Sequence, residues 1–362
     1  MSDTTEIGCQ PGSVLGAGDD LRVLLQTRGG QFVLSELNPE ESGGFERRLD
    51  KTSGLKMSAT ISGNLGDLCC EDFDQTRQWA VEARVMRDGR DAWVGPVTDI
   101  DYSYGKIEFL AADLTAWWDR RVLPTSRFTQ VDLANIFKAY HDQALATDPS
   151  PNFIVDPTLI GILGDREISG GDYVYASDAL SELSRTGIDW TAYGRRILVG
   201  GEEIPVDPQV VLSDEHFTEP PIVKARGSEQ ANVVIVKGKG VTGIARNQEH
   251  IDYYGELVRV FTEAEIEDQL SVNQSAQTRL DLLKDGLYVE TGRASVLRTT
   301  APVTLPELIP GIVVRVRAEG TCRKVTQDFR LESVDVGFGG QVSIKFQPIG
   351  TVDSTLRSGV LS

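Results

Sequence analysis

The chain of 362 residues has few of the residues that bind metals or form disulfides. It contains four cysteines and three histidines, with no Cys-x-x-Cys pair among the cysteines. Adjacent cysteines bridge only with strain, and no histidine stands at a ligand spacing from a cysteine or from another histidine. We therefore expect reduced thiols and no metal site. The residues concerned are Cys9, Cys69, Cys70, Cys322, His141, His216 and His250.

Long apolar runs are also missing. No stretch approaches the ~18 consecutive apolar residues that span a bilayer. The first nine residues have neither the basic start nor the apolar centre of a secretory signal. We expect no membrane-spanning segment and synthesis in the cytosol.

Basic residues are fewer than acidic ones. The chain has 36 Lys and Arg against 54 Asp and Glu, which gives a formal net charge of −18. Proteins that bind nucleic acids need lysine and arginine surfaces that displace counterions from phosphate, so this balance argues against nucleic-acid binding. A large negative charge most often serves solubility.

Glycine, by contrast, is abundant. It accounts for 36 of the 362 residues, above the average usage of about 7%, and this favours a turn-rich, mainly β protein. A chain of this length is expected to hold two or three domains of about 100–200 residues each.

An antiparallel meander is predicted near the end of the first third of the chain. Asp88-Gly89 provides a tight hairpin turn. The returning strand carries Trp93 and is expected to stop at Gly95-Pro96, because proline cannot donate to a strand ladder. The strand before the turn shows the alternation of a half-buried strand, and its apolar residues are Trp79, Val81, Ala83 and Val85.

The middle of the chain differs in kind. Thr129 with Asp132 makes an N-cap for a helix over residues 129–146. A second helix over residues 177–186 is expected to end at Gly187 in the left-handed conformation. A further hairpin follows this helix before Gly200.

β patterns return in the last third. A helical stretch is predicted from Thr262, capped by Glu265, to Gly286, and residues 271–275 are a point where it can break. The last element is a hairpin that turns at Gly337–Gly340.

Together these patterns predict an α+β fold that is mainly antiparallel β. The predicted parts are a flexible N-terminal arm over 1–19, a first β domain over 20–124, an α/β insert domain over 125–203, a second β domain over 204–350 with its helical segment over 262–286, and a C-terminal tail over 351–362.

The order of several short blocks resembles the minor tail proteins of long, non-contractile (siphovirus-type) phage tails, and most closely those that form the tail hub. The first blocks are an Arg-Asp-Gly turn, Trp93–Val97 and Ala112–Arg121. Later blocks are the Ile-x-x-Tyr-Gly segment that ends at Gly255, a helix, a strand led by Pro310-Gly311 and the final Gly-Gly hairpin.

This resemblance implies a structural virion protein of a phage with an actinobacterial host. In that family, two tail-tube-like β-barrel or sandwich domains per subunit give a homotrimer a pseudo-sixfold ring, which adapts the sixfold tail tube to the threefold tip. The implied partners are a distal tail ring or tail tube protein, the tape measure protein, and tail tip or fibre proteins. Double-stranded DNA passes through without specific binding, so the inner wall of such a conduit is expected to be net acidic or neutral, with few lysines or arginines facing the axis. The implied location is the virion tail tip, after assembly in the host cytoplasm, and no enzyme activity is implied.

A G-x-G-x-x-G spacing occurs at Gly238, Gly240 and Gly243. In dinucleotide-binding folds this pattern opens a helix whose N-terminus holds a pyrophosphate. Here no apolar helical face follows, and no strand ending in an acid comes about 20 residues later. A glycine-rich turn between strands is the better interpretation, and no cofactor is expected.

Three nearby carboxylates are candidates for a catalytic pair. Asp99 and Asp101 share one strand face, with Glu108 across the hairpin. Paired carboxylates hydrolyse glycosidic bonds, so a tail-associated cell-wall hydrolase is an alternative function. The same spacing is typical of the solvated face of any strand, and no catalytic residue is assigned. No G-x-S-x-G nucleophile elbow is found.

The segment Trp117–Arg121 contains two adjacent tryptophans and two arginines. On a strand, adjacent side chains point to opposite faces, so at most one indole is expected to face inward. The second would then pack on the insert domain or on another subunit, or bind a receptor or carbohydrate. The interface candidates are Trp117, Trp118, Arg120, Arg121 and Trp93.

Overall fold

The computed structural model describes most of the chain. The described residues are 21–37, 42–60, 76–87, 89–104, 106–184, 186–201, 209–225, 227–228, 230–263, 266, 268–284, 287–289, 295–320 and 323–356. The predicted arm over 1–19 and all four cysteines lie outside these ranges.

The chain divides into two compact units, each made of several stretches of sequence. The first unit is Met1–Val206, Val296–Ile312 and Leu331–Lys345, and the second is Asp207–Ser295, Val313–Arg330 and Phe346–Ser362. The domain boundaries predicted from the sequence divide the chain differently and stay a prediction.

Antiparallel strands open the first unit. They are β1 (Leu21–Thr27), β2 (Val33–Leu37), β3 (Gly44–Arg48), β4 (Gly54–Thr60), β5 (Val81–Arg87), β6 (Arg90–Ser103) and β7 (Lys106–Ala112). They pair in the order β2-β1-β5-β6-β7-β4-β3. Residues 333–337 of the long strand β21 (Arg323–Gly337) then pair with β3.

This order does not return to β2, so the described strands of the sheet close no barrel. The predicted fold class, α+β and mainly antiparallel β, is confirmed.

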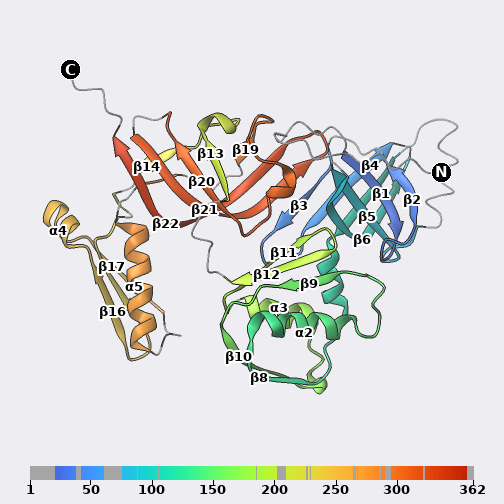
Figure 1. Ribbon diagram of the computed structural model, residues 1–362, viewed down its shortest axis with the longest axis horizontal. Coiled ribbons are helices and arrows are strands. Elements are labelled where there is room, and N and C mark those ends of the chain that lie inside the picture. Colours follow the sequence, from blue (N-terminus) through green and yellow to red (C-terminus); the bar gives the residue numbers. More distant parts are fainter. Residues whose placement is uncertain are drawn as a thin grey trace. The chain divides into compact units, whose positions relative to one another are not determined.

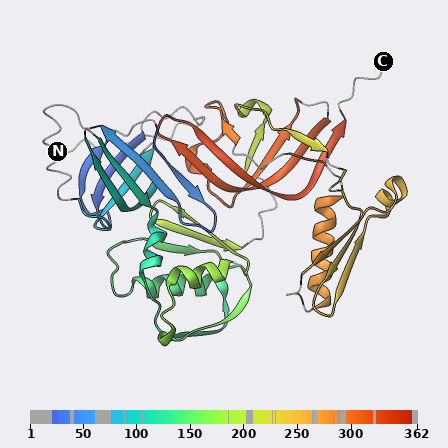
Figure 2. The ribbon, with the colours of Figure 1, turned by 180° about the vertical axis from the view of Figure 1, so that it is seen from behind.

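A smaller α/β region follows in the same unit. Its elements are η1 (Leu114–Arg120), β8 (Ser126–Asp132), α2 (Leu133–Leu145), β9 (Ile154–Pro157), β10 (Leu163–Ile168), η2 (Gly170–Asp172), α3 (Ala176–Ser184), β11 (Ile188–Tyr193) and β12 (Arg196–Gly201). Figures 1 and 2 show α2 and α3 beside the three-stranded sheet β11-β12-β9. Strand β11 contacts β3 and β6.

The remaining elements complete both units. They are β13 (Val210–Ser213), η3 (Asp214–His216), β14 (Val223–Ala225), β15 (Val233–Lys237), β16 (Thr242–Arg246), α4 (Gln248–Tyr254), β17 (Val258–Thr262), α5 (Gln269–Leu283), β18 (Leu287–Val289), β19 (Ser295–Leu297), η4 (Leu305–Glu307), β20 (Val313–Ala318) and β22 (Val342–Leu356). Figures 1 and 2 show α5 along one face of the sheet β16-β15-β17. Their shared core is Val234, Val236, Ala245, Val272, Ala276 and Leu280.

Several predicted elements are confirmed and two helix starts are corrected. The hairpin after Gly187 forms, and Gly187 has a positive φ of 99°. Helix α2 begins after Asp132, whose carboxylate accepts from the N–H of Ala134 at 2.9 Å, because Thr129 belongs to β8. Likewise, α5 begins after Asp268, because Thr262 still pairs in β17.

The expected break at residues 271–275 does not occur either. Helix α5 passes through them, because Val272, Ala276 and Leu280 lie four residues apart and keep one apolar face on the sheet. At the C-terminus, β22 extends to Leu356, into the segment predicted as a tail.

Strand β6 continues through Gly95 and Pro96, where it was predicted to stop. It pairs with β5 up to Pro96 and with β7 from Val97 onward, so the missing N–H of the proline falls where the ladder changes partner. Gly95 is required by close approach: a Cβ atom there would lie 1.8 Å from the carbonyl oxygen of Ala112.

Buried charge also organises the first unit. Arg47 of β3 is 1% exposed, and its guanidinium donates to the carbonyl oxygen of Ala92 at 3.0 and 2.8 Å. It also donates to the carbonyl oxygens of Leu305 at 3.0 Å and Leu308 at 3.1 Å, and it lies 5.1 Å from the ring centre of Tyr193. Burial lowers the pKa of Arg47 to about 10, so the side chain stays protonated at neutral pH.

We expect Gly95→Ala to destabilise the protein by about 3 kcal/mol or to prevent folding, because the new methyl group overlaps backbone atoms that cannot move away. Gly200→Ala is the matched control, since a Cβ atom at Gly200 meets nothing within 4 Å. Urea unfolding of both variants checks the prediction. Equal stability of the two variants would contradict the close approach of β6 to Ala112.

Candidate functional site

The tryptophan pair lies in the 3₁₀ helix η1 instead of on a strand. Asp113 caps this helix, and its carboxylate accepts from the N–H of Thr115 at 2.9 Å. With three residues per turn, adjacent side chains diverge by about 120°, not 180°. Both indoles are therefore buried, with exposed fractions of 4% for Trp117 and 2% for Trp118. The predicted strand is wrong, whereas the packing of one indole on the inserted region is as expected.

Trp118 packs among side chains of the α/β region. Its ring meets Phe137 of α2 edge-on at 5.6 Å between centroids, and Trp190 of β11 at 5.2 Å. Trp117 meets Trp79 at 5.0 Å. This segment thus connects the first sheet to the helices through one aromatic core.

The other interface candidates lie nearby. Arg120 and Arg121 stand over the rings of Trp79 and Trp117, at 4.9 Å and 5.1 Å from the ring centres. Arg121 also pairs with Asp148 at 2.8 Å. Trp93 is buried in the first sheet. Contacts of these residues with another subunit stay a prediction.

A second buried network holds the start of η1. The indole N–H of Trp93 donates to the hydroxyl of Ser53 at 3.2 Å. That hydroxyl donates to the carboxylate of Asp113 at 2.5 Å. Burial raises the pKa of Asp113, and the hydrogen bonds from Ser53 and Thr115 oppose that rise.

The imidazole of His141 in α2 accepts one hydrogen bond and donates another inside the aromatic core. The indole N–H of Trp118 donates to Nδ1 of His141 at 3.2 Å, which leaves Nε2 to donate to the carbonyl oxygen of Phe153 at 3.2 Å. Burial lowers the pKa of His141 to about 4. The imidazole is therefore neutral at neutral pH and acts as a structural link.

The free energy of unfolding is expected to fall as the pH is lowered from 6.5 through 4. In this window the unfolded chain binds the proton of His141 and the folded chain does not, which removes up to about 3 kcal/mol. A His141→Gln variant should lose most of this dependence. Urea unfolding at several pH values measures it, and an identical pH profile in the variant would disprove the buried neutral imidazole.

Sequence periodicity missed a buried ion pair. Alternation along β5 placed Glu82 on the solvent side, yet its side chain is 0% exposed. It forms an ion pair with Arg195 from the turn between β11 and β12, and it accepts from the N–H of Gly29 at 3.0 Å. The hairpin of β11 and β12 supplies the cation for this face of β5, a contact that a local pattern does not reveal.

The predicted acidic cluster lies on a strand surface. Asp99 and Asp101 are exposed, and Asp101 stands opposite Glu108. Glu108 pairs with Lys56 at 2.6 Å, and this contact raises the pKa of Lys56. The arrangement is that of a solvated strand face.

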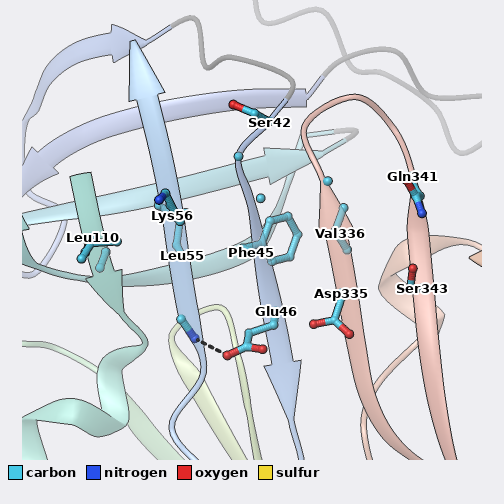
Figure 3. Close-up of a pocket in the computed structure, with 15 residues that line it drawn as sticks. Ser42, Phe45, Glu46, Leu55, Lys56, Leu110, Asp335, Val336, Gln341 and Ser343 are labelled. Atoms are coloured by element: carbon cyan, nitrogen blue, oxygen red, sulfur yellow. Dashed lines mark hydrogen bonds between the residues drawn. The ribbon is translucent and has the colours of Figure 1, made fainter. Parts of the chain in front are cut away.

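A hollow of about 550 Å³ lies in the first unit along β3, β4, β7 and the adjoining parts of β21 and β22 (Figure 3). Glu46 and Asp335 are direct partners on β3 and β21, and Figure 3 shows both side chains at this hollow. Glu46 also accepts from the N–H of Gly54 at 3.2 Å and pairs with Arg48 at 2.6 Å.

Asp335 is the carboxyl group of this hollow whose pKa is raised. Burial raises the pKa of Asp335, and the neighbouring Glu46 raises it further, against the opposite effect of Lys345 and Arg48.

We expect Asp335→Asn to stabilise the protein at pH 7 by about 0.5 kcal/mol, because it removes a like-charge pair across two strands. A raised folded-state pKa costs stability only above the ordinary aspartate pKa, so the gain should fade near pH 4 and below.

Asp328→Asn is the matched control on the same strand. Asp328 accepts from Arg315 at 2.7 and 2.9 Å, so its loss should destabilise. Urea unfolding of both variants at pH 7 and at lower pH checks the opposite signs. Destabilisation of Asp335→Asn at pH 7 would contradict the repulsion between the carboxyl groups of Glu46 and Asp335.

The G-x-G-x-x-G segment is a hairpin, as predicted. It joins β15 to β16, and Gly240 has a positive φ of 77°. Gly243 lies in β16 under α5, where a Cβ atom would be 2.3 Å from the carbonyl oxygen of Val272. The absence of a side chain at Gly243 therefore allows α5 to pack closely on β16.

Within the described part of the chain, no three His, Cys, Asp or Glu side chains come together as metal ligands would. No helix described there has the length and apolar character needed to cross a membrane.

No protein-family model matches the chain. No curated protein matches it significantly in sequence. Three solved structures share its fold. The tail protein from Neisseria meningitidis MC58 is 13% identical, with a TM-score of 0.55 over 91% of this chain and 96% of that one.

The 43 kDa tail protein of prophage MuSo2 from Shewanella oneidensis is 13% identical, with a TM-score of 0.56 over 90% of this chain and 95% of that one. Prophage tail protein gp18 from Listeria monocytogenes EGD-e is 11% identical, with a TM-score of 0.51 over 94% and 96%. The chain therefore has the fold of these tail proteins along almost its whole length.

Proposed function

We propose that this chain is a structural protein of a phage tail, and that three copies form the hub between the tail tube and the tail tip. The observation that carries the proposal is the fold shared with three tail proteins over at least 90% of both partners. A fold can host unrelated functions, and the likeness over the full length of both partners is what supports a structural role here.

The internal contacts suit a structural adaptor. Charged and aromatic side chains fix the α/β region to the first sheet through Glu82–Arg195 and Trp118. In this hypothesis the protein binds a distal tail ring or tail tube protein on one side and tip or fibre proteins on the other. The tape measure protein is a further partner, and the location is the tail tip of the virion, assembled in the host cytoplasm.

The proposed hub also forms part of the DNA conduit. The net charge of −18 supports this, since an acidic wall repels the polyanion and prevents it from sticking. Screening confines this repulsion to about 8 Å at physiological salt, so only residues near the wall matter. The inner wall is therefore acidic or neutral in this hypothesis. The siphovirus-type tail and the actinobacterial host belong to the same proposal.

Mass photometry of the purified protein should give a species of three times the 39.6 kDa chain mass. Labelled antibodies against the chain should mark the distal end of intact tails in electron micrographs. A monomer at all concentrations would contradict the homotrimer, and labelling away from the tail end would contradict the hub.

Two controls separate the alternative functions. Clearing of cell walls by the purified protein would favour the hydrolase. Binding of the isolated protein to cells or to a glycan array would favour a receptor-binding module.

A further inference from the structure

Four arginines meet at a second hollow, of about 420 Å³, in the first unit. It lies where the hairpin tips β5-β6 and β11-β12 touch: Gly194 has a φ of 57°, and a Cβ atom there would lie 3.0 Å from the Cβ of Asp91. The charged and aromatic residues of its lining are Arg84, Arg90, Asp91, Tyr193, Arg195 and Arg196.

Neighbouring carboxylates orient these guanidinium groups. Nε of Arg84 donates to Asp91 at 2.6 Å, and Arg195 pairs with the buried Glu82. A guanidinium carries five N–H donors. Among the described residues this is the one side-chain hydrogen bond of Arg84, so its two Nη groups are available to a further acceptor.

The balance of charge inside the hollow is positive. Asp91 is the single acid of its lining. Arg196 pairs with Asp156 outside the lining and is 55% exposed, and Arg90 is exposed as well. With four arginines and one acid in its lining, and with the Nη groups of Arg84 available, the hollow favours a negatively charged occupant.

The chemistry of the hollow favours carboxylate. Its arginines already pair with the carboxylates of Asp91, Glu82 and Asp156, and a guanidinium matches a carboxylate through two parallel hydrogen bonds. Arginine and tyrosine are also enriched in protein interfaces, and Tyr193 lines this hollow.

A second copy of the chain is the occupant that the charges fit. Each copy carries 54 acidic residues and a net charge of −18, so two copies repel unless a basic surface of one meets acids of the other. A net negative charge of this size also disfavours a DNA duplex. Beyond about 8 Å the repulsion between two copies is screened. The charges that face each other at the contact then decide whether the copies associate.

We infer that the arginine hollow binds a carboxylate-bearing surface of a second copy of this chain, and so forms a contact between subunits. The inference rests on the proposed homotrimer and names the site that holds it together. It predicts association that weakens with salt.

The test compares self-association of the full chain and its variants by sedimentation equilibrium. Arg84→Gln combined with Arg196→Gln should raise the dissociation constant about tenfold or more. The control combines Arg127→Gln with Arg246→Gln, two exposed arginines that pair with Glu167 at 3.9 Å and Glu256 at 2.9 Å. This control should associate like the unchanged protein.

A third variant keeps the inference testable if the double variant Arg84→Gln with Arg196→Gln, called the hollow variant, folds poorly. Asp91→Asn keeps the four arginines and removes the single acid, so it should associate more tightly. Each measurement is made at about 0.1 M and about 1 M NaCl, between which the Debye length falls from about 10 Å to about 3 Å. The association should weaken at the higher salt.

Unchanged association of the hollow variant, or equal loss in the control, overturns the inference and leaves the homotrimer intact. No association of the unchanged protein overturns both, while antibody labelling of tails still tests the tail location separately. Binding of a fluorescent DNA duplex that depends on Arg84 and Arg196, with association unaffected, would assign the hollow to phosphate instead.

Discussion

The buried guanidinium of Arg47 is the constraint on which the first unit depends. A charge removed from water costs several kcal/mol unless hydrogen bonds compensate for the loss of hydration. Here the acceptors are backbone carbonyl oxygens of Ala92, Leu305 and Leu308, the last two 258 and 261 positions away in sequence. Because the donors of arginine form a rigid fork, these two backbone segments have to keep a fixed geometry around β3.

The hairpin of β11 and β12 meets two buried charges of this unit, Arg47 and Glu82. Its Tyr193 ring lies beside Arg47, and its Arg195 pairs with Glu82. Strand β11 also provides Trp190 against Trp118. The α/β region is therefore attached to the first sheet by specific polar contacts as well as by apolar packing. Specific contacts of this kind fix one arrangement of the α/β region on the first sheet.

The shared fold at 13% and 11% identity has a plain physical basis. Many combinations of apolar side chains fill a core of given volume, and strand alternation tolerates most of them. The order of hairpins and crossovers is thus retained by patterns, not by particular residues. This is also why short ordered blocks pointed to tail proteins although no sequence comparison with curated proteins matches.

The sequence by itself determined the local elements. Alternation predicted β5, the Asp88-Gly89 pair predicted its hairpin, and Gly187 predicted the end of α3, because each depends on the conformational preferences of neighbouring residues. It also predicted that Gly238–Gly243 is a turn between strands. Helix starts were less accurate, since Thr129 and Thr262 are drawn into strands by partners remote in sequence.

Only the tertiary structure decided which polar groups are buried and which side chains meet. Glu82 reads as a solvent-facing residue of β5 until Arg195 covers it, and Glu46 meets Asp335 only because β21 returns to pair with β3. Trp117 and Trp118 are both buried because η1 replaces the expected strand. Periodicity reports the environment that a residue's own element creates, whereas burial by a segment far away in sequence depends on packing that no local pattern records.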